Sequence, residues 1–361
     1  MNLAKVLEIS LNDGYSLING EKLGPSYEEL GLKENPFTSF TETKKVFYRY
    51  LDYFIEKMIK AANKCIEALS LLPVPFASFF MCGGETGIDM RDCNGLGTKY
   101  NASGCLIHGL GTTADSLTVI KYLFDPDSKI IFSLSDLIAA LKRNFEGFKE
   151  LQNIIQQVPK YGNNIDYADE EAVELVKIVS EKINRQKNLF GKNFAADWSS
   201  PSTNLLYGYW TGATPDGRKA RERLSFGLDP SPEMAANGLL TRILSQSKLD
   251  YEIMTGGSAV AMSINPEGVK GMNLEQKAQY LKDIIGAIFD YSLEGKGQGL
   301  GYVYFNVFSS KQLLDVAEHP EKYPYPVIVR IHGQYVDARK LSPDILKKDI
   351  IPRLDPGSVS F

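Results

Sequence analysis

The stretch that decides the fold lies near the end of the chain and reads Val327-Ile328-Val329-Arg330-Ile331-His332-Gly333-Gln334-Tyr335. Its first residues predict a strand over 327–331, because β-branched side chains favour extended backbone. One glycine stands at the tip, and residues 336–341 lead away toward a last polar, helix-like segment. By itself Gly333 would be a hairpin-tip residue, since glycine adopts positive φ angles without steric cost.

The composition of the whole chain is that of a soluble globular protein. Its 361 residues are 43% hydrophobic, which is enough for the core of one large domain or two ordinary ones. No segment rich in proline, serine or charge separates domains, so we expect a single unit over 1–361. The formal net charge of −4 is spread over mixed acids and bases, which predicts that nucleic acid is not a partner.

The N-terminal residues predict neither export nor membrane insertion. Met1 to Lys5 open directly into an amphipathic helical pattern, and no continuous apolar run of membrane-spanning length follows. We therefore expect a cytoplasmic protein without a membrane partner. The four cysteines are too few for a disulfide framework and lack zinc-site spacing, so reduced thiols and no metal are expected. They are Cys65, Cys82, Cys93 and Cys105.

Hydrophobic periodicity predicts an α/β chain in which strands alternate with helices, the pattern of a parallel sheet. The run 73–81 is predicted as a strand or buried turn, and 194–209 shows little helical character. Expected helices cover 3–11, 40–72, 114–124, 134–153, 170–188, 235–246, 274–293, 310–318 and 344–351, and expected strands cover 259–264, 302–308 and 327–331.

A glycine-rich region follows the run 73–81 and begins Cys82-Gly83-Gly84-Glu85-Thr86-Gly87-Ile88-Asp89. Loops of this length within a compact domain usually carry function. Cys82, Glu85 and Asp89 are therefore weak site candidates. For Cys82 the competing interpretation is a buried, inert thiol.

Several stretches in this order and spacing resemble the C-terminal half of a glycyl radical enzyme, the family that includes pyruvate formate-lyase and the glycerol, diol and choline lyases. The resemblance runs from Leu3 to the end of the chain. The motifs that carry it are Gly24-Pro25, Pro73-Val74-Pro75-Phe76, Lys99-Tyr100-Asn101, Ala114-Asp115-Ser116-Leu117, Pro159-Lys160-Tyr161-Gly162-Asn163, Gly212-Ala213-Thr214-Pro215-Asp216-Gly217-Arg218-Lys219-Ala220, Phe305-Asn306-Val307, His319-Pro320-Glu321-Lys322-Tyr323 and Val329-Arg330-Ile331-His332-Gly333.

The resemblance implies a fold and a layout for the chain. The fold is half of a ten-stranded α/β barrel, with about five parallel strands, surrounding helices and a central glycyl finger loop. Residues 1–72 would form a helical layer and 73–326 the barrel half. Residues 327–361 would form the glycyl radical loop and a terminal helix.

The resemblance also implies that Gly333 is the glycine whose Cα carries a stored radical. A Cα radical is delocalised over the neighbouring amides, and without a Cβ the centre can flatten. Arg330 is the motif arginine and would fix the loop, with His332 beside it. No cofactor would be bound. An activating enzyme with an iron–sulfur cluster and S-adenosylmethionine would install the radical, which is typical of anaerobic metabolism.

The family mechanism needs a second residue, a cysteine in a Gly-Cys-hydrophobic-Glu motif, and none of the four cysteines lies in such a motif. The resemblance therefore implies a partner chain carrying this cysteine. Three local departures concern the site. Gln334 stands where the family usually has tyrosine, and His332 replaces a small residue. Tyr302 and Tyr304 replace a His and a Gln common in the lyase branch. Tyr302, Tyr304 and Asn306 are further weak site candidates.

The leading hypothesis is a glycyl-radical-bearing component of a radical lyase or dehydratase acting on a small molecule. One alternative is an inactive or truncated barrel half that serves as a scaffold or regulatory subunit. Another is a spare glycyl radical domain that rescues a damaged formate-lyase-type enzyme. The sequence leaves open the substrate and whether the chain forms an oligomer.

Overall fold

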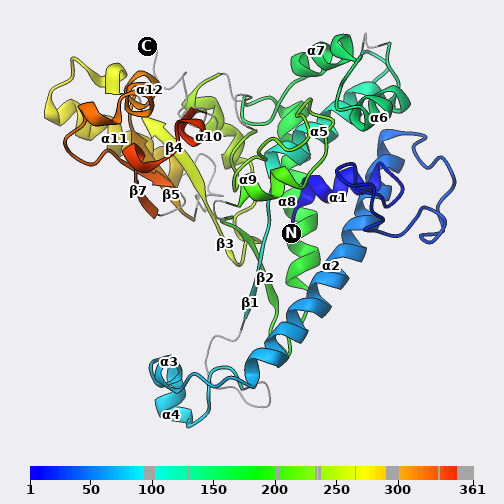
Figure 1. Cartoon of the computed structure of the whole chain (residues 1–361), viewed down its shortest axis with the longest axis horizontal. Coiled ribbons are helices and arrows are strands. Elements are labelled where there is room, and N and C mark those ends of the chain that lie inside the picture. The colour runs from blue at the N-terminus through cyan, green and yellow to red at the C-terminus, as the bar shows by residue number, and fades with distance from the viewer. Residues whose placement is uncertain are drawn as a thin grey trace.

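The structure is a computed structural model that describes residues 1–92, 102–128, 131–200, 203–231, 234, 237–264, 266–289, 301–331 and 334–347. Figure 1 shows two groups of elements on either side of short strands. One group holds the N-terminal helices, and the other holds the C-terminal helices with the last strands. The predicted motif Lys99-Tyr100-Asn101 and Cys93 lie outside the described residues.

The helices are α1 (Leu3–Ser10), α2 (Phe40–Ser70), α3 (Pro75–Ser78), α4 (Gly84–Thr86), α5 (Leu110–Leu123), α6 (Leu134–Lys142), α7 (Lys149–Gln157), α8 (Asp166–Asn184), α9 (Asn204–Tyr209), α10 (Leu239–Ser247), α11 (Leu274–Phe289), α12 (Ser310–Glu318) and α13 (Pro343–Ile345). Shorter helical turns are η1 (Phe79–Gly83), η2 (Pro266–Val269), η3 (Pro320–Lys322) and η4 (Ala338–Lys340). The strands are β1 (Ser103–Leu106), β2 (Phe194–Trp198), β3 (Gly257–Ser258), β4 (Val260–Ile264), β5 (Val303–Val307), β6 (Ile328–Ile331) and β7 (Gln334–Asp337).

Side-chain caps fix where the first two helices begin. The Asn2 side chain accepts a hydrogen bond from the Lys5 N–H at the start of α1, and Ser39 does the same for Glu42 at the start of α2. Each cap satisfies a backbone donor that a helix end leaves unpaired, an effect of about 1 kcal/mol. The sequence thus sets the starts of both helices locally.

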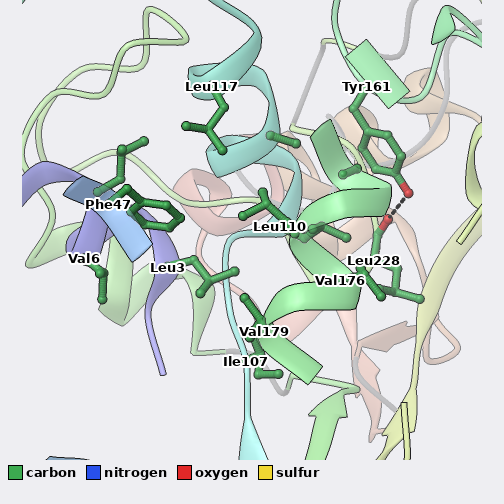
Figure 2. Packing of buried hydrophobic residues seen from close by; sticks show 14 of the residues in the cluster. Leu3, Val6, Phe47, Ile107, Leu110, Leu117, Tyr161, Val176, Val179 and Leu228 are labelled. Carbon is green, nitrogen blue, oxygen red and sulfur yellow. Dashed lines mark hydrogen bonds between the residues drawn. The ribbon is translucent and has the colours of Figure 1, made fainter. Parts of the chain in front are cut away.

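The core of the N-terminal group lies between α1, α2, α5 and α8 (Figure 2). Leu3, Phe47, Leu117 and Val176 are fully buried in it. Each such side chain contributes roughly 1.5–3 kcal/mol by leaving water. Tyr161 is also fully buried, and its hydroxyl donates to the Leu228 carbonyl at 3.1 Å, which satisfies its one polar group.

The strands form two parallel sheets and one hairpin. The first sheet has the order β1-β2-β3, and β4 pairs with β5 in the second. Strands β6 and β7 pair antiparallel. The predicted parallel pairing is therefore confirmed, while closure of these strands into half of a ten-stranded barrel remains a prediction. Strand β7 was not predicted, because residues 334–337 lack a run of apolar or β-branched side chains.

The prediction for the run 73–81 was wrong. This run forms the short helix α3 and the turn η1, which kinks at Met81 and Cys82. Its phenylalanines are exposed rather than buried, with 81% of Phe76 and 69% of Phe80 accessible. The prediction was wrong because it rested on apolar character alone. An apolar run predicts that its side chains are buried, but it does not show which element would bury them.

Other boundaries also differ from the predictions. Helices α5 and α8 each begin four residues before their predicted starts at 114 and 170. The helix expected over 134–153 is broken into α6 and α7, because Asn144, Phe145 and Gly147 have positive φ angles between them. Residues 194–209 contain β2 and the six-residue helix α9. Helix α13 (Pro343–Ile345) overlaps the start of the last helix expected, 344–351, of which residues 348–351 lie outside the described residues. Helix α12, by contrast, spans 310–318 as predicted.

No single helix in the described ranges is long and apolar enough to cross a membrane. One bent pair, Phe40–Ser70 with Pro75–Thr86, meets the length and composition criteria together, with an angle of 101° between its two parts. Much of the first part is amphipathic and packs on the core through Phe47, Tyr50 and Leu51.

Candidate functional site

The β6–β7 hairpin carries the residue that the sequence singles out. Ile331 on β6 pairs directly with Gln334 on β7, and His332 and Gly333 separate them in the sequence. Both of these site residues lie outside the described residues. The described part of the site consists of the strands that flank Gly333 in the sequence, β6 and β7, and the residues that contact them.

Asn306 on β5 holds β6 through two hydrogen bonds. Its side-chain amide donates to the Arg330 carbonyl at 3.0 Å, and its side-chain oxygen accepts from the Arg330 N–H at 2.8 Å. An amide side chain can satisfy both backbone groups of one residue because it carries a donor and an acceptor. The hairpin is thus fixed to the β4–β5 sheet three residues before Gly333.

The Arg330 side chain lies among three tyrosine rings. Its guanidinium carbon is 5.5 Å from the Tyr302 ring centre, 5.2 Å from Tyr304 and 5.1 Å from Tyr335. These distances are within the range of cation–π attraction, about 6 Å. The guanidinium also donates a hydrogen bond to the Tyr302 hydroxyl, whereas its buried Nε has no partner among the described residues.

The surroundings of Tyr304 raise the pKa of its hydroxyl above the ordinary value. Burial is the largest cause that raises its pKa, and the positive charge of Arg330 acts in the opposite direction. Tyr302, Tyr304, Asn306 and Arg330 form one cluster, the Arg330 cluster, where β5 meets the β6–β7 hairpin. The sequence identified its members but not that they meet.

The hairpin has its own small apolar core. Its buried members are Leu313, Val316, Ala317, Val327, Val329, Ala338 and Leu346. At the far end of the hairpin the Arg339 guanidinium pairs with the Asp337 carboxylate, which lowers the pKa of that group to about 2. Asp337 also accepts from the Val327 N–H at 3.2 Å, so both ends of the hairpin are held.

The three candidates in the glycine-rich region lie elsewhere. Figure 1 shows α3 and α4 at the far end of α2, well away from β5 and β7. Glu85 is exposed on α4, and Cys82 lies at the kink of η1 with a φ of 71°. Asp89 accepts from the N–H groups of Arg91 and Val74, and the Arg91 hydrogen bond is the largest cause that lowers its pKa. The structure gives Asp89 a local structural contact and does not bring these residues to the Arg330 cluster.

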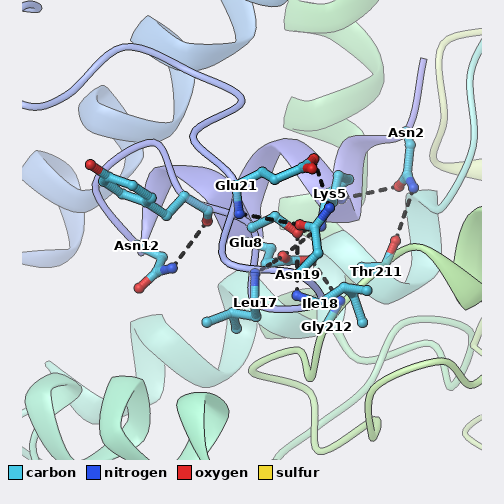
Figure 3. A network of polar contacts seen from close by, with 12 residues as sticks. Asn2, Lys5, Glu8, Asn12, Leu17, Ile18, Asn19, Glu21, Thr211 and Gly212 are labelled. Carbon is cyan, nitrogen blue, oxygen red and sulfur yellow. Dashed lines mark hydrogen bonds and ion pairs between the residues drawn. The ribbon is translucent and has the colours of Figure 1, made fainter.

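Sequence reasoning missed a buried polar network that ties Thr211 and Gly212, just before the Thr-Pro-Asp-Gly-Arg turn, to α1 (Figure 3). Glu8 is 1% exposed and accepts from the Gly212 N–H at 2.6 Å, the Leu17 N–H at 2.7 Å and the Lys5 ammonium at 2.6 Å. A Cβ on Gly212 would meet the Leu17 Cβ at 2.7 Å, so this position requires glycine. The buried carboxylate is stabilised because all its neighbours donate to it.

A second group that the sequence analysis missed surrounds Arg218. Its backbone N–H donates to the Asp216 carboxylate at 3.4 Å, and its guanidinium donates to backbone carbonyls, among them Gly212 at 2.6 Å and Gly208 at 2.9 Å. Nearby on α5, burial is the main cause that raises the pKa of the Asp115 carboxyl to about 7, and the negative charge of Asp216 adds to it. These groups hold parts of the fold together and do not belong to the Arg330 cluster.

A cavity of about 910 Å³ opens beside the Thr-Pro-Asp-Gly-Arg turn. Cations and anions both line it, including Arg218, Lys219, Arg221, Asp216 and Glu222. This mixture selects no single class of ligand. In the described ranges no group of three or more His, Cys, Asp or Glu side chains is placed to hold a metal ion.

Comparison with known protein families gives this geometry its context. The family model "Pyruvate formate lyase-like" matches residues 1–208, and the model "Glycine radical" matches residues 224–337. The chain therefore belongs to the pyruvate formate lyase-like family, and the resemblance to glycyl radical enzymes is confirmed. The Arg330 cluster and Gly333 fall within the second match.

Individual relatives are dehydratases. The chain is 31% identical to trans-4-hydroxy-L-proline dehydratase of Clostridioides difficile over 98% of its own length and 43% of that protein. It is 28% identical to (2S)-3-sulfopropanediol dehydratase of Klebsiella oxytoca, over 98% of this chain and 41% of that protein.

A solved structure, the glycerol-bound B12-independent glycerol dehydratase from Clostridium butyricum, superposes with a TM-score of 0.85 at 31% identity, over 98% of this chain and 42% of that one. The described fold is therefore that of part of a glycyl radical enzyme barrel. The chain spans less than half the length of these relatives.

Proposed function

We propose that this chain is the glycyl-radical-bearing component of a radical dehydratase. The observation that carries the proposal is the position of Gly333. It follows strand β6 within the segment that matches the glycine radical model, three residues after the arginine that Asn306 holds. In this proposal Arg330 fixes the loop rather than reacting, and His332 lies beside the radical.

In this proposal the chain supplies half of the family barrel. Five strands pair in parallel in two sheets, and the chain spans 42–43% of the relatives with TM-scores of 0.82–0.85. The complementary strands would come from a second polypeptide. That polypeptide would also supply the cysteine in the Gly-Cys-hydrophobic-Glu motif.

The proposed placement of Gly333 and the cysteine on two polypeptides implies the following order of steps. An activating enzyme, with its iron–sulfur cluster and S-adenosylmethionine, removes one hydrogen atom from the Gly333 Cα and leaves a carbon radical. The partner's thiol then gives a hydrogen atom back to Gly333 and becomes a thiyl radical. The thiyl radical takes a hydrogen atom from the substrate and returns one to the product. Each transfer requires reacting atoms about 3–3.5 Å apart, so the two polypeptides must meet at Gly333.

The substrate would be a small hydroxylated molecule that loses water. This class is supported by the names of the relatives, which are dehydratases of hydroxyproline, sulfopropanediol and glycerol. The aromatic and cationic Arg330 cluster includes residues of the strands that flank Gly333 in the sequence, and in this proposal Tyr302 and Tyr304 would limit the space available to the substrate.

Oxygen sensitivity gives a direct test. After anaerobic treatment with an activating enzyme, exposure to air should cleave the chain at Gly333, and mass spectrometry should detect the two fragments. Gly333→Ala should remain intact. Gly271→Ala is a matched control in the same segment, because Gly271 has an ordinary φ angle and a Cβ there meets no atom within 4 Å. Cleavage of Gly333→Ala, or an intact wild-type chain after activation, would contradict the proposal.

A further inference from the structure

One carboxylate on β2 faces away from the large apolar core. Phe194, Ala196 and Trp198 of this strand are buried in that core, and alternate residues of a strand point to opposite faces of the sheet. Asp197 therefore lies on the other face, where it is partly buried. The Trp198 indole N–H donates to the Ser180 hydroxyl at 3.0 Å. Packing on the core side of β2 thus sets the position of Asp197.

One oxygen of the Asp197 carboxylate is held, and the other is free to accept. Oδ1 accepts from the Ser199 N–H at 2.9 Å and from the Ser199 hydroxyl. Oδ2 has no hydrogen-bond partner in the part of the chain that the structure describes. Ser199 therefore fixes the orientation of the carboxylate and leaves an oxygen that can only accept hydrogen bonds.

Glycines on both neighbouring strands leave space around this free oxygen. A Cβ on Gly104 of β1 would meet Oδ2 of Asp197 at 3.9 Å and no other atom within 4 Å. Gly257 of β3 is paired with Asp197 in the sheet, and a Cβ there would meet no atom within 4 Å. Glycine within a strand often marks a place where a ligand approaches closely. Neither neighbouring strand therefore places a side chain over the carboxylate.

The same face of the sheet leads to the β6–β7 hairpin. Only Ala259 separates β3 from β4 in the chain, and on this face Tyr304 of β5 packs with Ala259 and Ala261. Asn306, two residues further along β5, holds the hairpin. Two strand spacings separate β2 from β5, a distance of about 10 Å. Asp197 and the residues that hold the hairpin therefore share one face, at a separation that suits a small molecule between them.

We propose that Asp197 is a substrate-binding residue, which accepts a hydrogen bond from a hydroxyl or ammonium group of the substrate and excludes a carboxylate or sulfonate at that position. This inference rests on the proposed function, because it concerns the substrate of the same reaction. A carboxylate attracts hydrogen-bond donors and repels a second anion. The substrate class is thus a small polyol or amino alcohol without an acidic group at this end.

Three molecules that differ in one group provide matched probes. Glycerol, 3-aminopropane-1,2-diol and (2S)-3-sulfopropanediol share a diol, and their third carbon carries a hydroxyl, an ammonium or a sulfonate group. Relatives of the chain are named for the first and the last of these molecules. Because the diol is constant, a difference in binding reports on the group that faces Asp197.

The Ser199 amide is a local reporter, since its N–H donates to Oδ1 of Asp197. In nuclear magnetic resonance titrations of the full, unactivated chain, glycerol and the aminodiol should shift this amide signal. Sulfopropanediol should bind at least about tenfold more weakly. Tighter binding of the aminodiol would support an amino alcohol as the substrate, and tighter binding of glycerol would support a polyol. Equal binding of all three probes, or no shift of Ser199 with any of them, would overturn the proposal.

Asp197→Asn removes the charge and keeps the size of the side chain. Sulfopropanediol should bind this variant at least about tenfold more tightly than it binds the wild-type chain, while glycerol binding should change about threefold or less. A misfolded variant would not show such a gain. Asp283→Asn makes the same change of charge on the exposed face of α11 and should leave all three affinities unchanged. Unchanged sulfopropanediol binding by Asp197→Asn would overturn the proposal.

The two proposals fail in different ways. If activation gives a radical at Gly333 but probe binding does not depend on Asp197, the binding role of Asp197 is wrong and the proposed function stands. If the three probes bind in the expected order and Asp197→Asn changes it, but no radical forms, the binding role stands and the radical assignment is wrong.

Discussion

Phe47 on α2 and Asn306 on β5 both join elements that are distant in the sequence, but they do so by different means. Phe47 is fully buried in a core that extends from Leu3 to Ile288. Asn306 joins β5 to the β6–β7 hairpin through two hydrogen bonds, and that hairpin packs on a separate, smaller core. The part of the chain that packs around this large core, called the main body below, is therefore stabilised by apolar burial. The strands beside Gly333 in the sequence depend on a few polar contacts. Local opening should cost less at the hairpin than in the main body.

The largest effect should come from the main body. Phe47→Ala should lower the free energy of unfolding by about 3–5 kcal/mol, because it leaves a cavity in a core that cannot fully close. Urea denaturation followed by circular dichroism measures this loss. Leu69→Ala, at a side chain 46% exposed on the same helix, should change stability by no more than about 0.5 kcal/mol. A loss below about 1 kcal/mol for Phe47→Ala would show that the main body does not depend on this packing.

A pH effect of a few kcal/mol should also come from the main body. Burial raises the pKa of Asp115 to about 7 from 3.8, so the folded state holds a proton that the unfolded state has released between these values. Stability should therefore fall as the pH rises through this window. Asp115→Asn should flatten that part of the pH profile of the melting temperature, while Asp283→Asn on the exposed face of α11 should not. An unchanged slope for Asp115→Asn would contradict this account of the buried carboxyl.

A smaller, local effect should appear at the hairpin. Asn306→Ala removes two hydrogen bonds to Arg330 and should make opening of β6 easier by about 1–3 kcal/mol. Hydrogen exchange at the Arg330 amide should become roughly tenfold to a hundredfold faster, and the unfolding midpoint of the main body should not move. Asn306→Asp keeps the acceptor for the Arg330 N–H and should show a smaller change. A uniform change across both regions would mean that they do not respond separately.

The smallest effect should follow Arg330→Lys. Lysine keeps the positive charge but loses the planar guanidinium that lies among the rings of Tyr302, Tyr304 and Tyr335. The expected loss is about 1 kcal/mol of local stability, measured as faster amide exchange in β6 and β7. Exchange as slow as in the wild-type chain would show that the ring contacts contribute nothing measurable.

The sequence predicted most of what depends on local pattern. The ends of α12, the strands near Phe305 and Val329, and the parallel pairing were all predictable from periodicity and element order. The exposure of the phenylalanines of η1 was not predictable, because an apolar run predicts burial and does not show whether another element covers it. Helix α9 was missed because six residues containing Gly208 are too short to show a helical period.

The sequence predicted the residues of the candidate site but not the contacts between them. Gly333 and Arg330 come from a recognisable motif, and Asn306 stood among the weak candidates. The pairing of Asn306 with Arg330 joins residues 24 positions apart, and no local pattern specifies such a contact.

The central claim concerns Gly333, and electron paramagnetic resonance tests it most directly. The chain is incubated without oxygen together with an upstream partner chain and an activating enzyme. A doublet typical of a glycyl radical should appear with the wild-type chain and with Gly271→Ala, and it should be absent with Gly333→Ala. A doublet that persists in Gly333→Ala, or its absence from the wild-type mixture, would contradict the assignment of the radical to Gly333.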